Sequence, residues 1–157
     1  MKIDLPYKVK PIYVTQDMCD LNNHMNVCFY HQIFEDNSNT FYSDEMLFTD
    51  AHFQSGFSTF TLEDNVRYLK EFLLEDKINI EYALYAVNHK LVHMIGCLKD
   101  ANNKPSAFWE TILGHIDMKK RKTTNFSLKH YDHLLSLNKD HQKNMFIDIN
   151  IRLKLNK

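Results

Sequence analysis

A polar turn between Asp17 and Asn26 carries the residues best suited to chemistry in this sequence. A carboxylate, Asp20, and an imidazole, His24, lie four residues apart in it, among several asparagines. From Asn26 onward, larger apolar side chains recur at spacings of three, four and seven, which predicts one face of a helix. These side chains are Tyr30, Ile33, Phe34 and Phe41. Asn26 is the expected cap, because its amide oxygen can accept a bond from a first-turn N–H.

The start of a helix suits chemistry that develops negative charge. Its first N–H groups have no partner within the helix, and the helix dipole is positive there. A carboxylate beside such donors can activate water or attack a carbonyl, which is what acyl transfer and hydrolysis require. Asp20 is therefore the first catalytic candidate, with His24 and Asn26 as its partners. The alternative is that Asp20 only shapes the turn, as short acids often do.

The motif resembles a known family. The residues that carry the likeness are Asp20, Asn22, Asn23, His24, Met25, Asn26, Tyr30 and Glu35. They are similar to the signature of hotdog-fold acyl-CoA thioesterases of the 4-hydroxybenzoyl-CoA type. The Asp-x-Asn-x-His-Met-Asn version, with the segments 60–71, 109–110 and 115–117, looks more like the betainyl-CoA thioesterases of carnitine breakdown. The sequence departs from the pattern at Asn23, where Gly is usual, and at Asn65, where His is expected.

The resemblance implies a single hotdog domain over residues 1–157, with its core at 6–120 and a helix and tail at 121–157. It implies an enzyme that hydrolyses a short acyl-CoA, such as betainyl-CoA, to a free acid and CoA without a cofactor. It also implies a homodimer or homotetramer with sites at the subunit interface. The expected substrate-binding residues are Asn22, Tyr30, Glu63, Tyr68 and Trp109.

Two groups of side chains are candidates for holding particular parts of such a substrate. A quaternary ammonium group would need an aromatic wall, for which Phe60, Tyr68 and Trp109 are available, although aromatic residues in strands are commonly core. The phosphates of CoA would need Lys or Arg at a pocket rim. The candidates are Lys70, Lys119, Lys120 and Arg121, with Lys122 beside them, and the alternative is a solvated run of charge.

The sequence contains no motif for a metal or a phosphate loop. His89 and His93 are four apart and His130 and His133 three apart, but no motif supplies a third ligand. The first pair also falls on an expected strand, where this spacing separates residues by about 13 Å. The three glycines form no phosphate loop, and no Gly-x-Ser-x-Gly elbow is present. We therefore expect neither a metal site nor a cofactor.

Composition is typical of a globular domain and limits the choice of partners. The chain has 157 residues, 44% of them hydrophobic and 25% charged, which is enough for a sizeable core. A net charge of −1 argues against nucleic acid or a membrane surface as partner. No apolar run approaches the roughly 20 residues that span a bilayer, and the N-terminus resembles no secretion signal. Three cysteines without metal-site spacing favour a reduced, cytoplasmic protein.

The expected elements follow an α+β pattern. We predict a strand at 6–14, the helix from 26 to 46, a loop at 47–57, and a strand at 60–68. In this last strand Phe60, Leu62, Val66 and Tyr68 share an apolar face, which Asp64 interrupts as a bulge or a site residue. Further strands at 78–86, 90–99 and 106–118, a helix at 126–137 and a strand-like run at 145–155 along the sheet edge follow. A long helix wrapped by about five antiparallel strands agrees with the hotdog fold.

Two other functions on the same fold remain open. One is a non-catalytic module that binds an acyl thioester, against which the intact Asp20 argues. The other is an enoyl-CoA hydratase, whose motif pairs Asp and His five residues apart in a turn containing Pro. Here Asp20 and His24 are four apart and the Pro is missing, which makes the hydratase the weaker alternative.

Overall fold

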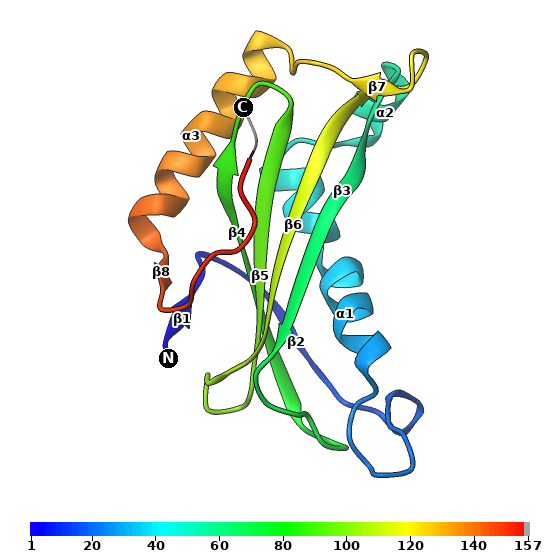
Figure 1. The fold of residues 1–157 in the computed structure, drawn as a ribbon, viewed down its shortest axis with the longest axis vertical. Coiled ribbons are helices and arrows are strands. Elements are labelled where there is room, and N and C mark those ends of the chain that lie inside the picture. Colours follow the sequence, from blue (N-terminus) through cyan, green and yellow to red (C-terminus); the bar gives the residue numbers. More distant parts are fainter. Residues whose placement is uncertain (156–157) are drawn as a thin grey trace.

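The computed structural model describes residues 1–155, which form an antiparallel sheet with a long helix against one face (Figure 1). The strands of this sheet are β2 (Tyr7–Tyr13), β3 (Phe57–Tyr68), β4 (Lys77–Val87), β5 (Leu91–Lys99), β6 (Pro105–Asp117) and β7 (Lys122–Thr123). They lie in the order β2-β4-β5-β6-β3, and β7 pairs with β6. The helices are α1 (Val27–Thr40), α2 (Asp50–Gln54) and α3 (Leu128–Asn144).

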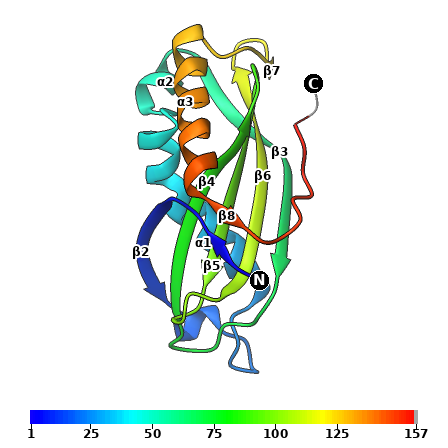
Figure 2. The same cartoon turned by 90° about the vertical axis from the view of Figure 1, so that its left-hand side faces the viewer.

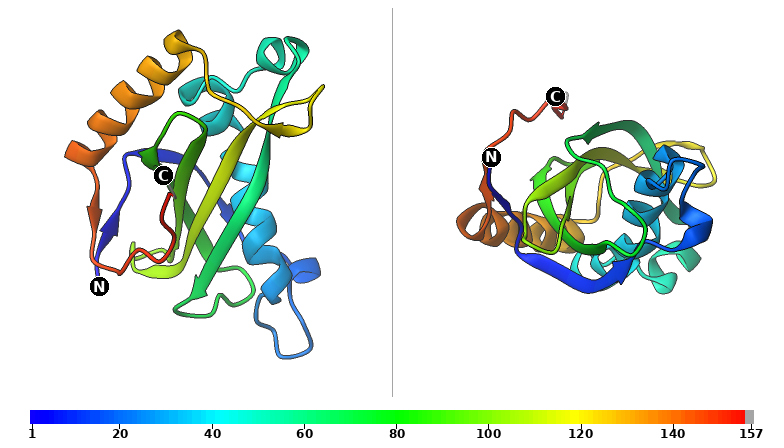
Figure 3. Two further views of the ribbon diagram at one scale, coloured as in Figure 1. Left: turned by 45° about the horizontal axis from the view of Figure 1, so that its top comes forward. Right: turned by 90° about the horizontal axis from the view of Figure 1, so that it is seen from below.

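This arrangement confirms the predicted α+β class, the hotdog fold and the C-terminal helix. Figure 2 shows the sheet between α1 on one side and the C-terminal segment on the other. Seen from below in Figure 3, the sheet curves from β2 towards β3. The antiparallel meander β4-β5-β6 forms its centre, and these three strands are the most buried ones of the sheet.

The apolar face predicted for α1 packs against the sheet. Its large side chains, Tyr30, Ile33, Phe34 and Phe41, are all buried. Phe34 stacks on Trp109 with 5.3 Å between ring centroids, and the Tyr82 hydroxyl donates to the Phe34 carbonyl at 2.7 Å. Gly96 on β5 permits this approach, because a Cβ at that position would lie 2.9 Å from a carbon of the Phe34 ring. The glycine thus sets the distance between α1 and the sheet.

Three helical segments differ from their predicted bounds. α1 ends at Thr40, and a π-helical segment, Phe41–Glu45, continues it to the expected end. The loop predicted at 47–57 contains α2, whose first turn is capped by the Thr49 side chain. α3 runs beyond the predicted end at 137, because polar side chains extend its contact with β4. Asn138 donates to the Leu84 carbonyl at 3.0 Å, which the apolar pattern could not reveal.

A β-bulge in β3 overturns the predicted face of this strand. The ladder with β6 shifts at Leu62, so that this residue is inserted between two regular stretches. Phe60 lies opposite Gly114 and Val66 opposite Trp109, and these two partners point to opposite faces because side chains alternate along β6. The prediction of one shared face was therefore wrong. After the bulge, the side of β3 that carries Val66 faces α1.

The two terminal segments cover the outer face of the sheet. β1 (Ile3–Asp4) pairs with β8 (Phe146–Ile147) in a separate two-stranded sheet, and residues 148–155 continue without strand structure (Figure 2). The predicted strand over 145–155 at the sheet edge was thus largely wrong. Its backbone is held by a side chain instead, since Glu110 Oε1 accepts the N–H groups of Arg152 and Leu153 at 2.8 and 3.1 Å. Residues 156 and 157 of the predicted tail lie outside the described residues.

Buried and half-buried histidines make the stability of this fold depend on pH. Burial lowers the pKa of His52 and of His93 to about 4, and it also lowers the pKa of His115. Among the described residues, the Nε2 atoms of these three side chains have no hydrogen-bond partner. Between pH 6.5 and about 4, an unfolded chain therefore binds more protons than the folded one.

We accordingly expect the free energy of unfolding to fall steadily as the pH is lowered from 6.5 towards 4. Urea unfolding at several pH values measures it, and His93→Leu should flatten the slope because it removes one buried imidazole. A stability that is constant or rises over this interval would contradict the assignment of neutral histidines.

Candidate functional site

The polar turn before α1 folds as a compact loop tied to the segment after β3. Asn26 caps α1 as predicted, because its side chain accepts the Cys28 N–H at 3.1 Å. Asn23 has a φ of 60°, which lies in the left-handed region. Asparagine tolerates this conformation better than most residues, and glycine adopts it freely, which explains why the resembling thioesterases usually carry Gly at this position. The Met25 N–H donates to the Phe72 carbonyl at 2.8 Å and fixes the loop against its neighbour.

Asp20 and His24 are in direct contact. The Asp20 Oδ2 atom lies 3.0 Å from His24 Nε2, and Oδ1 accepts the backbone N–H of Asn22 at 2.8 Å. The two side chains are 31% and 37% exposed, so the pair remains accessible to water. A carboxylate oriented in this way by an imidazole and an amide can accept a proton from a bound water.

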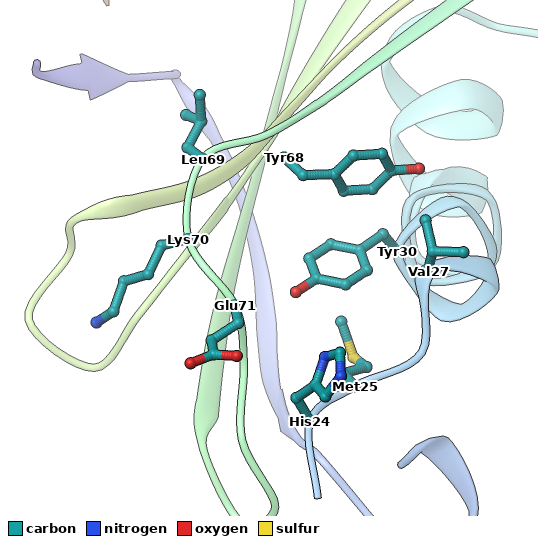
Figure 4. Close-up of a pocket in the computed structure, with 8 residues that line it drawn as sticks. All are labelled: His24, Met25, Val27, Tyr30, Tyr68, Leu69, Lys70 and Glu71. Carbon is teal, nitrogen blue, oxygen red and sulfur yellow. The ribbon is translucent and has the colours of Figure 1, made fainter. Parts of the chain in front are cut away.

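A cavity of about 410 Å³ opens beside His24 of this pair (Figure 4). Its lining residues are His24, Met25, Val27, Tyr30, Tyr68, Leu69, Lys70 and Glu71. The rings of Tyr30 and Tyr68 meet edge to face at 5.1 Å, and the Tyr30 hydroxyl accepts the Phe72 N–H at 3.1 Å. The cavity thus joins the start of α1 to the end of β3, and His24 links it to Asp20.

Three predicted substrate-binding residues do not border this cavity: Trp109, Glu63 and Asn22, whose backbone N–H donates to Asp20 in the polar turn. Trp109 is buried against Phe34 and borders a separate cavity of about 240 Å³ between α1 and β3. Glu63 lies opposite Ile112 on β6. Because side chains alternate along β6, Ile112 points to the face opposite that of Trp109, and Glu63 shares the face of Ile112. Within one chain, therefore, the fold brings Tyr30, Tyr68 and His24 together and leaves Trp109 and Glu63 apart from them.

The basic residues predicted to bind CoA divide into two places. Lys70 borders the cavity and pairs with Asp100 at 3.0 Å. Lys119, Lys120 and Arg121 follow β6, beside the opposite end of β3. The 12 residues of β3 separate the two places by about 36 Å. A single chain does not bring the basic run to the cavity.

A second polar group, which the sequence alone did not reveal, lies between α1 and β3. His31 Nε2 is 3.2 Å from Asp64 Oδ2, and the Trp109 Nε1–H donates to Asp64 Oδ1 at 3.2 Å. Glu35, one turn along α1 from His31, completes the group, with ligand atoms all within 4.8 Å of one another. The sequence did contain one signal of this group, because Asp64 interrupts the apolar pattern of the strand predicted at 60–68. Its contact with His31 on α1 appears only in the fold.

Comparison with known proteins gives a family and a common fold. A profile described as the thioesterase-like superfamily matches residues 14–136. The protein SAV2348 from Staphylococcus aureus, solved in complex with CoA, has 22% identity, a TM-score of 0.80 and 98% coverage of both chains. DHNA-CoA thioesterase from Staphylococcus aureus has 15% identity and a TM-score of 0.69, with 83% of this chain and 92% of that one covered.

A thioesterase from Thermus thermophilus, complexed with coenzyme A and Zn, has 14% identity and a TM-score of 0.69, with 83% of this chain and 98% of that one covered. At these identities the solved structures establish the fold. A search of curated proteins gives no match. Among residues 1–155, no helix has the length and apolar character needed to span a membrane.

Proposed function

Because the chain belongs to the thioesterase-like superfamily, we propose that it hydrolyses an acyl-CoA thioester to a free acid and CoA. The observation that carries this proposal is the contact between Asp20 and His24 directly before the capped start of α1. The adjoining cavity offers room for an acyl group next to this contact. Base, oriented partner and helix start thus meet at one place, as thioester hydrolysis requires.

The chemistry follows from these positions. Asp20 removes a proton from a water molecule as the water oxygen attacks the thioester carbon. The Val27 N–H, the first of α1 and at the cavity wall, stabilises the negative oxygen of the tetrahedral intermediate, since the Cys28 N–H is already taken by the Asn26 side chain. Its collapse breaks the C–S bond, and the proton held on Asp20 passes to the departing thiolate of CoA. His24 holds the carboxylate in place; direct attack by Asp20, through an anhydride, is the alternative route that this geometry also permits.

The cavity supports a short acyl group, with betainyl-CoA as the specific substrate that we propose. Tyr30 and Tyr68 supply two aromatic rings to its wall, and ring faces attract quaternary ammonium groups. Glu71, which also lines the cavity, adds negative charge for the same cation. Trp109 has no part in this wall, because it lies buried against Phe34.

We also propose that two chains pair along β3. β3 ends the sheet, and no strand of residues 1–155 pairs with its outer edge. Antiparallel pairing about a two-fold axis would bring the basic run at 119–121 of one chain towards the Tyr68 end of the other. This supports CoA phosphate binding across the dimer. We expect sedimentation velocity to show a dimer. A monomer with full activity would refute the proposed pairing along β3.

The function is tested by measuring CoA release from a panel of acyl-CoAs that includes betainyl, acetyl, butyryl and benzoyl thioesters. We expect saturable release, fastest with the short cationic acyl group. Release that is fastest with another acyl group would contradict the substrate but support the hydrolase. If no thioester is hydrolysed while acyl-CoA binds tightly, the protein is instead a binding module.

A further inference from the structure

The group formed by His31, Glu35 and Asp64 combines ligand types that bind metal ions. His31 and Glu35 lie one turn apart on α1, and Asp64 faces them from β3. Their ligand atoms, one imidazole nitrogen and two carboxylate oxygens, lie within 4.8 Å of one another. Among residues 1–155 this is the one group of three such side chains that meets this geometry.

The charges of the group are not balanced by the protein. Two carboxylates lie near one imidazole, which pairs with Asp64, and within residues 1–155 no side chain donates to the carboxylate of Glu35. A cation between the two carboxylates would supply the missing positive charge.

We propose that this group binds a divalent metal ion of the zinc type, with one imidazole and two carboxylates as ligands. Ligand atoms around tetrahedral zinc lie about 2.0–2.1 Å from the metal, and hence about 3.3 Å from one another. His31 Nε2 and Asp64 Oδ2 are already 3.2 Å apart. Only the carboxylate of Glu35, an exposed residue with a long side chain, has to move closer. A fourth position is left for water.

The residues behind the group hold one ligand in a suitable orientation. Trp109 is 1% exposed, stacks on Phe34, and donates its indole N–H to Asp64 Oδ1. This bond leaves Oδ2 directed at His31. Outer hydrogen bonds to ligating carboxylates have this role in metal sites, where they fix the ligand before the ion arrives. The sequence prediction of no metal site rested on other histidines and did not consider this group.

The test is direct metal binding, which does not depend on the proposed hydrolase activity. Protein freed of metal with a chelator is titrated with Co²⁺, followed by visible absorption, and with Zn²⁺, followed by calorimetry. We expect one ion per chain. His31→Ala and Asp64→Asn should each weaken binding at least about tenfold.

Asp36→Asn is the matched control, because Asp36 lies on the same helix and is outside the group of three ligands. It should bind metal like the wild type. Absence of binding by the wild-type protein would overturn the proposal, and so would unchanged binding by His31→Ala. His31 is 45% exposed, so loss of its side chain should leave the fold intact, as circular dichroism can verify.

Discussion

Replacing Asp20 by Asn is expected to lower kcat for CoA release by at least about 10³-fold. The amide has the size of the carboxylate, and its oxygen can still accept the Asn22 N–H, so the turn should persist. It can neither take a proton from water nor attack the thioester carbon. The loss should therefore fall on kcat, with KM changed little. Initial rates over a range of acyl-CoA concentrations separate the two parameters.

Asp17→Asn is the matched control for this experiment. Asp17 lies in the same polar turn, but its carboxylate accepts the Thr15 hydroxyl at 2.5 Å, whereas His24 pairs with Asp20, so the replacement of Asp17 should leave kcat near the wild-type value. His24→Gln should reduce kcat by a smaller factor than Asp20→Asn, because it removes an orienting contact and not the base. An Asp20→Asn variant with wild-type kcat would refute the catalytic assignment while leaving the fold unaffected.

Replacing Glu110 by Gln is expected to destabilise the protein by about 3–5 kcal/mol. Glu110 is fully buried, and its Oε2 atom accepts a hydrogen bond from Nη2 of Arg67 at 3.0 Å. Its other oxygen accepts the backbone N–H groups of Arg152 and Leu153. A glutamine would turn its NH₂ group towards one set of these donors, and it would leave the largely buried guanidinium of Arg67 without a negative charge beside it.

Urea unfolding measures this loss, and hydrogen exchange locates it. The amides at 150–155 should exchange faster in Glu110→Gln, because the C-terminal segment loses its attachment to the sheet. Glu63→Gln, on the exposed part of the neighbouring strand, serves as the control and should change stability little. A loss below about 1 kcal/mol for Glu110→Gln would mean that Glu110 does not hold this segment.

The sequence by itself determined the elements whose signals are local. The spacing of apolar side chains predicted α1, and the amide of Asn26 predicted its first turn, because helical periodicity and capping involve residues a few positions apart. The strands predicted at 78–86, 90–99 and 106–118 likewise match β4, β5 and β6 closely. The position of Asp20 and His24 before the helix followed from the same local pattern. These features do not depend on which element packs against which.

Only the tertiary structure decided which of these residues share a site. One inserted residue, Leu62, reversed the faces of β3, and an alternating pattern cannot reveal where such an insertion lies. The contact of His31 with Asp64 and the capture of the C-terminal backbone by Glu110 join residues far apart in the sequence. Such contacts are fixed by the register of the sheet and by the helix lying on it, so they leave no local signal in the chain.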